Sequence, residues 1–347
     1  REASIEQVIL SSEDAIGVVV PEATVKEALL GMQQQYPSQE DFESDLADNH
    51  LSRRLLWQSL ERQLRVEAVM ERVGSRVAEV SEVEVTRLTS GMTVATHAMA
   101  HLESVALGVW VGTGSRNEKA SQHGISHLLE HMAFKGTATR DAYAIAAEIE
   151  AVGGHLNAYT SRENTAYYVK VLKEHTPLAV TLLADILQNP VFDPQEVERE
   201  RTVILQEIGQ AQDTPDDIVF DHFQETAYRG QSMGWPVLGS VETVQTMSRD
   251  AIAGFMASRY QAGNMVVAAA GAVDHETLVA LVEAAFTKLG RAAVEAPAAA
   301  RYTGGDYREA RECEQVHLLL GFEGLARGDA DRYAASVLAN LLGGGMS

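Results

Sequence analysis

Three residues, His127, Glu130 and His131, have types and spacings that could do chemistry together. On an α-helix, residues three or four positions apart share one face. Such a helix would present the two imidazoles to one metal ion, with the Glu130 carboxylate beside it. Imidazole nitrogen is a common metal ligand, and a carboxylate next to the metal can take a proton from a bound water. The spacing therefore predicts metal-assisted hydrolysis.

The segment from Ser121 to Lys135 has the pattern of the helix that this chemistry requires. Ser121 suits its N-cap, and Gly136 suits the stop after its last turn. Between them, apolar residues recur at spacings of three and four, at Ile125, Leu128, Leu129 and Met132. The pattern leaves an alternative open, in which two surface histidines merely flank a solvated carboxylate.

Catalytic zinc has three protein ligands and an open position, so a further ligand is needed. The segment from Pro194 to Gln212 is predicted to be a long helix with Asp193 as its N-cap. Glu200 and Glu207 are seven positions apart on it and therefore face the same way. Most glutamates on such a helix are solvated, so this pair gains meaning only together with the first motif.

Three segments, in this order, resemble the pitrilysin-type (M16) metallopeptidases, especially the mitochondrial processing peptidase β subunit and its bacterial relatives. They are GISHLLEHMAFKGT, GGHLNAYTSRENTAYYVKV and ERERTVILQEI. The resemblance implies one Zn²⁺ held by His127, His131 and Glu207, because the family's third ligand lies 76 residues after the second histidine. It also implies Glu130 as the general base and Glu200 as a group that orients a ligand.

The resemblance assigns no metal-binding role to His123, which we interpret as a polar residue of the first helical turn. S-ribosylhomocysteine lyases share the His-x-x-Glu-His order but take a cysteine as third ligand. Cys313 lies far downstream in a segment that resembles the peptidases, which argues against that alternative.

A strand pair is predicted over residues 155–160 and 165–171, where residue types alternate. In the M16 family the first of these strands binds extended peptide through its main chain. The alternative for the strand pair is an ordinary hairpin in the sheet. The alternative for Phe134, which could line the site, is a position in the core. The residues expected to contact substrate are Asn157, Ala158, Thr160 and Phe134.

The formal net charge of −21, from 28 basic and 49 acidic residues, argues against nucleic acid or an anionic membrane as partner. It favours a basic peptide as substrate. A single cysteine permits no internal disulfide and fits a reducing compartment. We expect a bacterial cytoplasmic protein, with the periplasm less favoured.

Residues 1–82 are poor in glycine and have helical periodicity over Val25–Tyr36, Ser38–Asp48 and Leu51–Val77. This segment resembles the helical N-terminal region of the nitrogenase-maturation (NifM-type) peptidyl-prolyl isomerases. It contains no parvulin motif, so isomerase activity is not implied. Binding of unfolded polypeptide is one interpretation, and an inert helical bundle is the other.

Residues 83–290 are predicted to form an α+β M16 half-domain, with a mixed sheet packed by helices, which the all-α segment precedes. Residues 291–303 form a low-complexity linker. Residues 304–347 begin a second half-domain, with a strand over 314–320 and a helix over 329–342. The family's substrate-holding arginine and tyrosine have no counterpart in this incomplete second half.

We therefore expect a zinc endopeptidase that cleaves extended, basic peptides and forms a homo- or heterodimer with a second M16 subunit. The alternative is a non-catalytic, chaperone-like protein that binds peptides or unfolded polypeptides without cutting them. The incomplete second half-domain is the reason for keeping this alternative.

Overall fold

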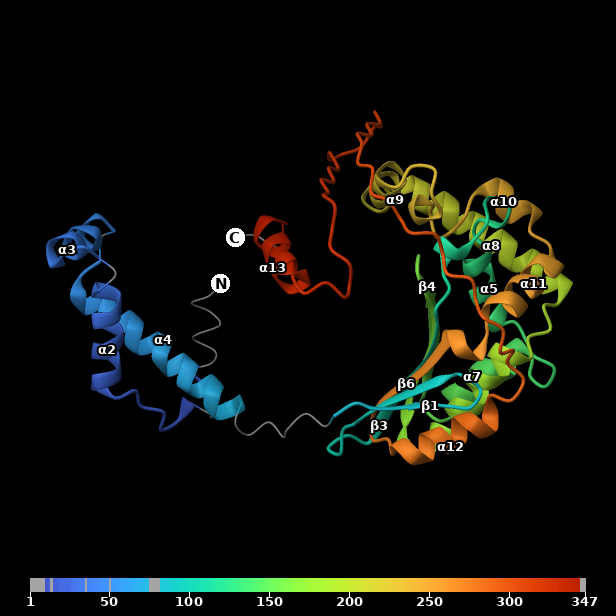
Figure 1. Ribbon diagram of the computed structural model, residues 1–347, viewed down its shortest axis with the longest axis horizontal. Helices are drawn as coiled ribbons and strands as arrows, with labels where there is room; N and C mark the ends of the chain where they lie inside the picture. The colour runs from blue at the N-terminus through green and yellow to red at the C-terminus, as the bar shows by residue number, and fades with distance from the viewer. Residues whose placement is uncertain (1–9, 13–14, 35, 50, 75–81, 344–347) are drawn as a thin grey trace. The chain divides into compact units, whose positions relative to one another are not determined.

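The computed structural model describes residues 10–12, 15–34, 36–49, 51–74 and 82–343. The chain divides into two compact units, Arg1–Val80 and Ser81–Ser347 (Figure 1). Among the residues described, no helix combines the length and apolar character needed to cross a bilayer.

The first unit is helical, with α2 (Glu22–Gln33), α3 (Gln39–Asp48) and α4 (Arg53–Gly74). The Ser38 hydroxyl accepts the Asp41 amide hydrogen and caps α3. All three predicted helices are present, although the end of the third, near Val77, lies outside the described residues. A small apolar core holds the helices together and consists of Val25, Phe42, Leu46, Leu56 and Leu60.

The second unit is built on a six-stranded mixed sheet in the order β1-β2-β6-β3-β5-β4. The β2–β6 pair is parallel and the other pairs are antiparallel. Strand β4 therefore lies at one edge, with one side of its main chain unpaired within the sheet. The strands are β1 (Glu84–Arg87), β2 (Thr93–Ala98), β3 (Ser104–Val111), β4 (His155–Thr160), β5 (Thr165–Leu172) and β6 (Met265–Gly271).

Helices cover one face of this sheet (Figure 1). The alternation of strand residues explains this layer, because every second side chain points into the core beneath the helices, as Val105, Leu107, Val109 and Val111 do on β3. The predicted α+β architecture is confirmed. The helices are α5 (Ile125–Ala133), α6 (Ala142–Glu150), α7 (Thr176–Gln188), α8 (Pro194–Asp213), α9 (Pro215–Ala227), α10 (Val241–Thr246), α11 (Arg249–Arg259) and α12 (His275–Ala285).

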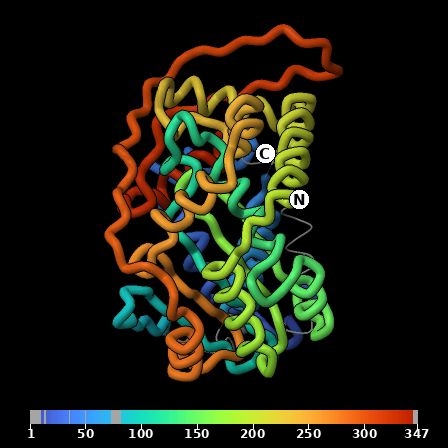
Figure 2. The backbone as a smooth tube through the Cα atoms, turned by 90° about the vertical axis from the view of Figure 1, so that its right-hand side faces the viewer, coloured from blue at the N-terminus to red at the C-terminus, as the bar shows by residue number. Residues whose placement is uncertain are grey.

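The linker at residues 291–303 contains no helix or strand, yet side chains of the half-domain bond its main chain. Arg116 donates to the carbonyl of Ala298, and Arg259 donates to that of Glu295, both at 2.8 Å. Gln231 bonds both the amide and the carbonyl of residue 301. Figure 2 shows this segment, in orange, running along the outside of the unit. The linker is thus attached along its length.

The predicted strand over residues 314–320 is wrong, since the structure has no strand there. The alternating residues Val316, Leu318 and Leu320 are 95, 87 and 77% exposed. A strand needs a neighbour for its main chain and a layer for its apolar face, and no other described strand pairs with this segment. The helix predicted beyond it is present as α13 (Arg332–Gly343).

Candidate metal centre

Helix α5 begins at Ile125, three residues later than an N-cap at Ser121 predicts, and Ser121 is not its N-cap. Ser121 lies in a short 3₁₀ turn, and Gly124 occupies the N-cap position with φ 92°. The capping acceptor comes from an earlier loop, because the Glu118 carboxylate accepts the amide hydrogens of Gly124 and Ser126, both at 2.8 Å. Local capping patterns could not reveal Glu118, which acts across a bend in the chain.

The start of α5 is also fixed by a backbone contact between Gly124 and Gly239. A Cβ atom added to Gly124 would lie 2.8 Å from the Gly239 Cα, and one added to Gly239 would lie 2.7 Å from the Gly124 Cα. Both residues have positive φ, 92° and 86°, which glycine adopts at little cost. Any side chain at either position would separate the two segments.

Burial of Glu118 predicts a pH-dependent stability. Burial raises the pKa of its carboxyl from 4.5 to about 7, against the opposing effect of the amide hydrogen bonds. Folding therefore takes up a proton between these pH values, and stability falls as the pH rises through them. Relative to Glu118→Gln, wild type should lose up to about 3 kcal/mol of unfolding free energy from pH 4.5 to 7. Urea unfolding with chelator present would measure this, and parallel pH profiles would contradict it.

Helices α5 and α8 bring three candidate metal ligands together. The Nε2 atoms of His127 and His131 each lie 3.9 Å from Oε2 of Glu207. One ligand atom from each residue lies within 4.8 Å of the others. Among the described residues, no other group of three histidine, cysteine or acidic side chains meets this criterion.

The donor atoms fit a zinc ion. Glu207 Oε2 is buried and has no hydrogen-bond partner among the described residues, an arrangement that is costly unless a cation compensates it. Two ligands at about 2.1 Å from zinc lie at most about 4.2 Å apart, so the 3.9 Å separations are compatible. Two histidines and one glutamate also form a known catalytic zinc set that leaves a position open.

The protonation states of the histidines suit metal binding. Burial, with repulsion from His131 second, lowers the pKa of His127 to about 4 and keeps it neutral, the form that binds a metal. Nδ1 of His131 lies 2.8 Å from Oε2 of Glu200, a buried residue on α8. The carboxylate can only accept, so the proton sits on Nδ1 and leaves Nε2 free to face Glu207.

Glu130 lies beside this cluster on α5. Its Oε2 accepts a 2.6 Å hydrogen bond from Oγ1 of Thr160, the last residue of β4. Burial raises the pKa of Glu130, and the Thr160 hydrogen bond partly opposes this rise. A carboxylate with a raised pKa takes up a proton more readily, which suits a general base.

The predicted substrate-contact residues differ in their surroundings. Thr160 is engaged with Glu130, and Asn157 is exposed on edge strand β4. Oδ1 of Asn157 accepts the amide hydrogen of Ala158 at 2.8 Å, so a peptide pairing with that amide would have to displace the carboxamide. Phe134 is half-buried against the core, with its ring centroid 6.1 Å from that of Tyr167.

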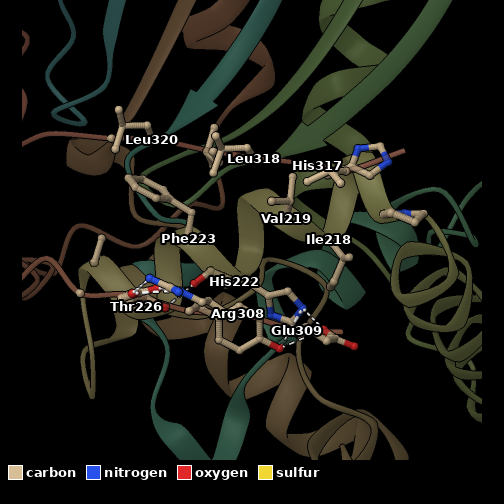
Figure 3. Close-up of a pocket in the computed structure, with 18 of the residues that line it drawn as sticks. Ile218, Val219, His222, Phe223, Thr226, Arg308, Glu309, His317, Leu318 and Leu320 are labelled. Carbon is tan, nitrogen blue, oxygen red and sulfur yellow. Dashed lines mark hydrogen bonds and ion pairs between the residues drawn. The ribbon is translucent and has the colours of Figure 1, made fainter. Parts of the chain in front are cut away.

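The two alternatives considered for the metal site lie elsewhere. His123 donates through Nε2 to the carbonyl of Pro236 at 2.7 Å and packs near Trp235. Cys313 is exposed and lines a cavity of about 710 Å³ between α9 and residues 302–321. Figure 3 shows Phe223 of α9 and Leu318 in this cavity. Its lining contains none of the three candidate ligands, so we do not assign the cavity to the metal centre.

Two family models match the chain. The one described as Insulinase (Peptidase family M16) matches residues 93–241, and the one described as Peptidase M16 inactive domain matches residues 246–347. The chain belongs to the M16 peptidase family. All candidate metal and base residues lie within the first match.

Sequence relatives of this M16 chain carry related names. It is 42% identical over 264 residues to an uncharacterized zinc protease of Rickettsia felis, covering 76% of this chain and 64% of that protein. It is 39% identical over 269 residues to the mitochondrial-processing peptidase subunit beta of Blastocladiella emersonii, covering 76% and 57%. The chain thus spans less than two thirds of these relatives. The matches confirm the predicted family, and the Rickettsia felis relative is by its name a zinc protease.

A solved structure supports the fold of this M16 chain. The peptidase M16 inactive domain from Pseudomonas fluorescens superposes with a TM-score of 0.65 at 19% identity. The match covers 77% of this chain and 65% of that one. At this identity the likeness establishes the fold alone.

Proposed function

We propose that this chain is the catalytic half of a zinc endopeptidase, with His127, His131 and Glu207 as metal ligands. The unpartnered Oε2 of Glu207, buried at 3.9 Å from two imidazole nitrogens, carries the proposal. Family membership supports a metallopeptidase, and the donor geometry supports these three residues as its ligands.

The side chains of the site have separate roles in peptide-bond hydrolysis. A bound zinc ion would polarise the scissile carbonyl and make water more acidic. Glu130 takes the proton from the attacking water and returns it to the leaving amine. Thr160 holds the Glu130 carboxylate in place through its hydroxyl. Glu200 holds the His131 ring through Nδ1.

The substrate in this proposal is an extended peptide that pairs with the free edge of β4. That edge ends at Thr160, whose hydroxyl contacts Glu130, so a peptide added to the sheet would pass beside the base. Main-chain pairing requires an unfolded segment. The net charge of −21 supports a preference for basic peptides.

A second M16 subunit is part of the proposal. The Blastocladiella relative is by its name one subunit of a processing peptidase, and this chain spans 57% of it. Exposed Val316, Leu318 and Leu320 leave an apolar segment uncovered in the described part of the second half. A homo- or heterodimer would supply further surface for holding substrate.

Cleavage of a basic, presequence-like peptide, with and without a zinc chelator, tests the proposal. Cleavage that stops with chelator and returns with added zinc is expected. No cleavage by a chain that binds one zinc would favour the alternative, a peptide-binding protein without catalysis. Failure to bind zinc would refute the metal centre itself.

A further inference from the structure

Lys135 lies just beyond the C-terminus of α5 and reaches back to the group that orients His131. Its Nζ atom lies 2.8 Å from Oε1 of Glu200, whose other oxygen lies 2.8 Å from Nδ1 of His131. The Glu200 side chain is 7% exposed and that of Lys135 is 30% exposed. One carboxylate thus joins a lysine to a candidate zinc ligand, with one partner on each oxygen.

The charges around the metal centre explain what the contact between Lys135 and Glu200 contributes. Glu200 is buried and Glu130 and Glu207 are partly buried, so three carboxylates lie in this region, and a zinc ion would supply two positive charges. A buried carboxylate without a compensating charge is costly. Lys135 supplies a third positive charge. It donates a hydrogen bond to Glu200, the carboxylate that contacts Nδ1 of the candidate ligand His131.

We propose that Lys135 is a positioning residue for the metal centre, which raises zinc affinity by fixing the Glu200 carboxylate against Nδ1 of His131. The inference rests on the proposed zinc site. Without the ammonium group, Oε1 of Glu200 loses its partner. The carboxylate is then free to rotate or hydrate, and the His131 ring is less firmly held for the metal. Residues that orient a metal-binding histidine typically contribute about 10–100-fold to affinity.

The test compares zinc affinity, measured by competition with a chromogenic chelator at fixed pH, for wild type, Lys135→Met and Lys135→Arg. The methionine variant should bind zinc about 10–100-fold more weakly. The arginine variant should recover most of the affinity, since a guanidinium also pairs with a carboxylate. Lys173→Met is the matched control, because Lys173 pairs with Glu103 in an exposed bridge at the opposite end of β5 from Thr165. The control should bind zinc like wild type.

A second readout is the visible spectrum of the Co²⁺-substituted protein, which reports ligand geometry. We expect an altered spectrum in Lys135→Met and a wild-type spectrum in Lys135→Arg. If Lys135→Met fails to fold, Lys135→Gln, which keeps a donor without the charge, replaces it. Equal zinc affinity in wild type and the uncharged variant would overturn the inference and leave the proposed function standing. Absence of zinc binding by wild type would overturn both.

Discussion

A Glu130→Gln chain should bind zinc nearly as wild type does and cleave peptide about 100- to 10,000-fold more slowly, the usual contribution of a general base. Glutamine has the size of glutamate and can still accept the hydroxyl hydrogen of Thr160, which lies 2.6 Å from Oε2 in the wild type. It cannot accept the proton of the attacking water. The loss should therefore fall on kcat, measured with a saturating fluorogenic peptide.

Two comparisons make this result interpretable. Glu150→Gln removes a carboxylate from the exposed end of α6 and should leave kcat unchanged. Zinc content of Glu130→Gln, measured on the same preparation, separates loss of the base from loss of the metal. If cleavage by Glu130→Gln matched that of wild type, the assignment of the base would be wrong.

Replacing Glu207 with glutamine should cost more than a hundredfold in zinc affinity. Changes to groups that only orient a ligand cost about 10–100-fold, and loss of a direct anionic ligand should exceed that. The neutral amide would also remove the charge that places a cation between the two imidazoles. Titration of the metal-free protein with zinc, followed by competition with a chelator, measures the effect.

Glu198→Gln is the matched control for this experiment. Glu198 lies on the same helix α8, its side chain is 68% exposed and it pairs with Arg201 rather than with any candidate metal ligand, so its loss should leave zinc affinity unchanged. Without metal, the unfolding curve of Glu198→Gln should coincide with that of wild type within about 0.5 kcal/mol, as for most surface changes. Glu207→Gln should be no less stable than wild type without metal, because the oxygen that it changes is buried and has no hydrogen-bond partner among the described residues. Full zinc affinity in Glu207→Gln would refute this residue as the third ligand.

Much of the site could be predicted because its spacing is helical. His127 and His131 share a face on any helix, and Asp193 caps α8 with a local side-chain contact that residue types alone indicate. The β4–β5 pair follows from alternation around a short polar turn. These features depend on residues that are close together in the sequence, which is the range over which sequence patterns are informative.

The errors occurred where distant segments decide the local structure. Ser121 has the residue type of an N-cap, but Gly124 ends the preceding turn and Glu118 supplies the acceptor. Residues 314–320 alternate as a strand does, yet a strand forms only with a partner. Lys135 gave no sequence signal, because its role depends on a carboxylate that lies 65 positions along the chain.

The contact between Gly124 and Gly239 has a consequence for how this chain tolerates change. In a library of random variants selected for peptide cleavage, both positions should retain glycine as strictly as His127 retains histidine. Neither glycine carries a reactive group. A Cβ atom at either position would lie less than 3 Å from backbone atoms of the other segment. This contact fixes the residue at which α5 begins. A survey of mutational tolerance would therefore find the start of the metal-binding helix as intolerant of substitution as the metal ligands.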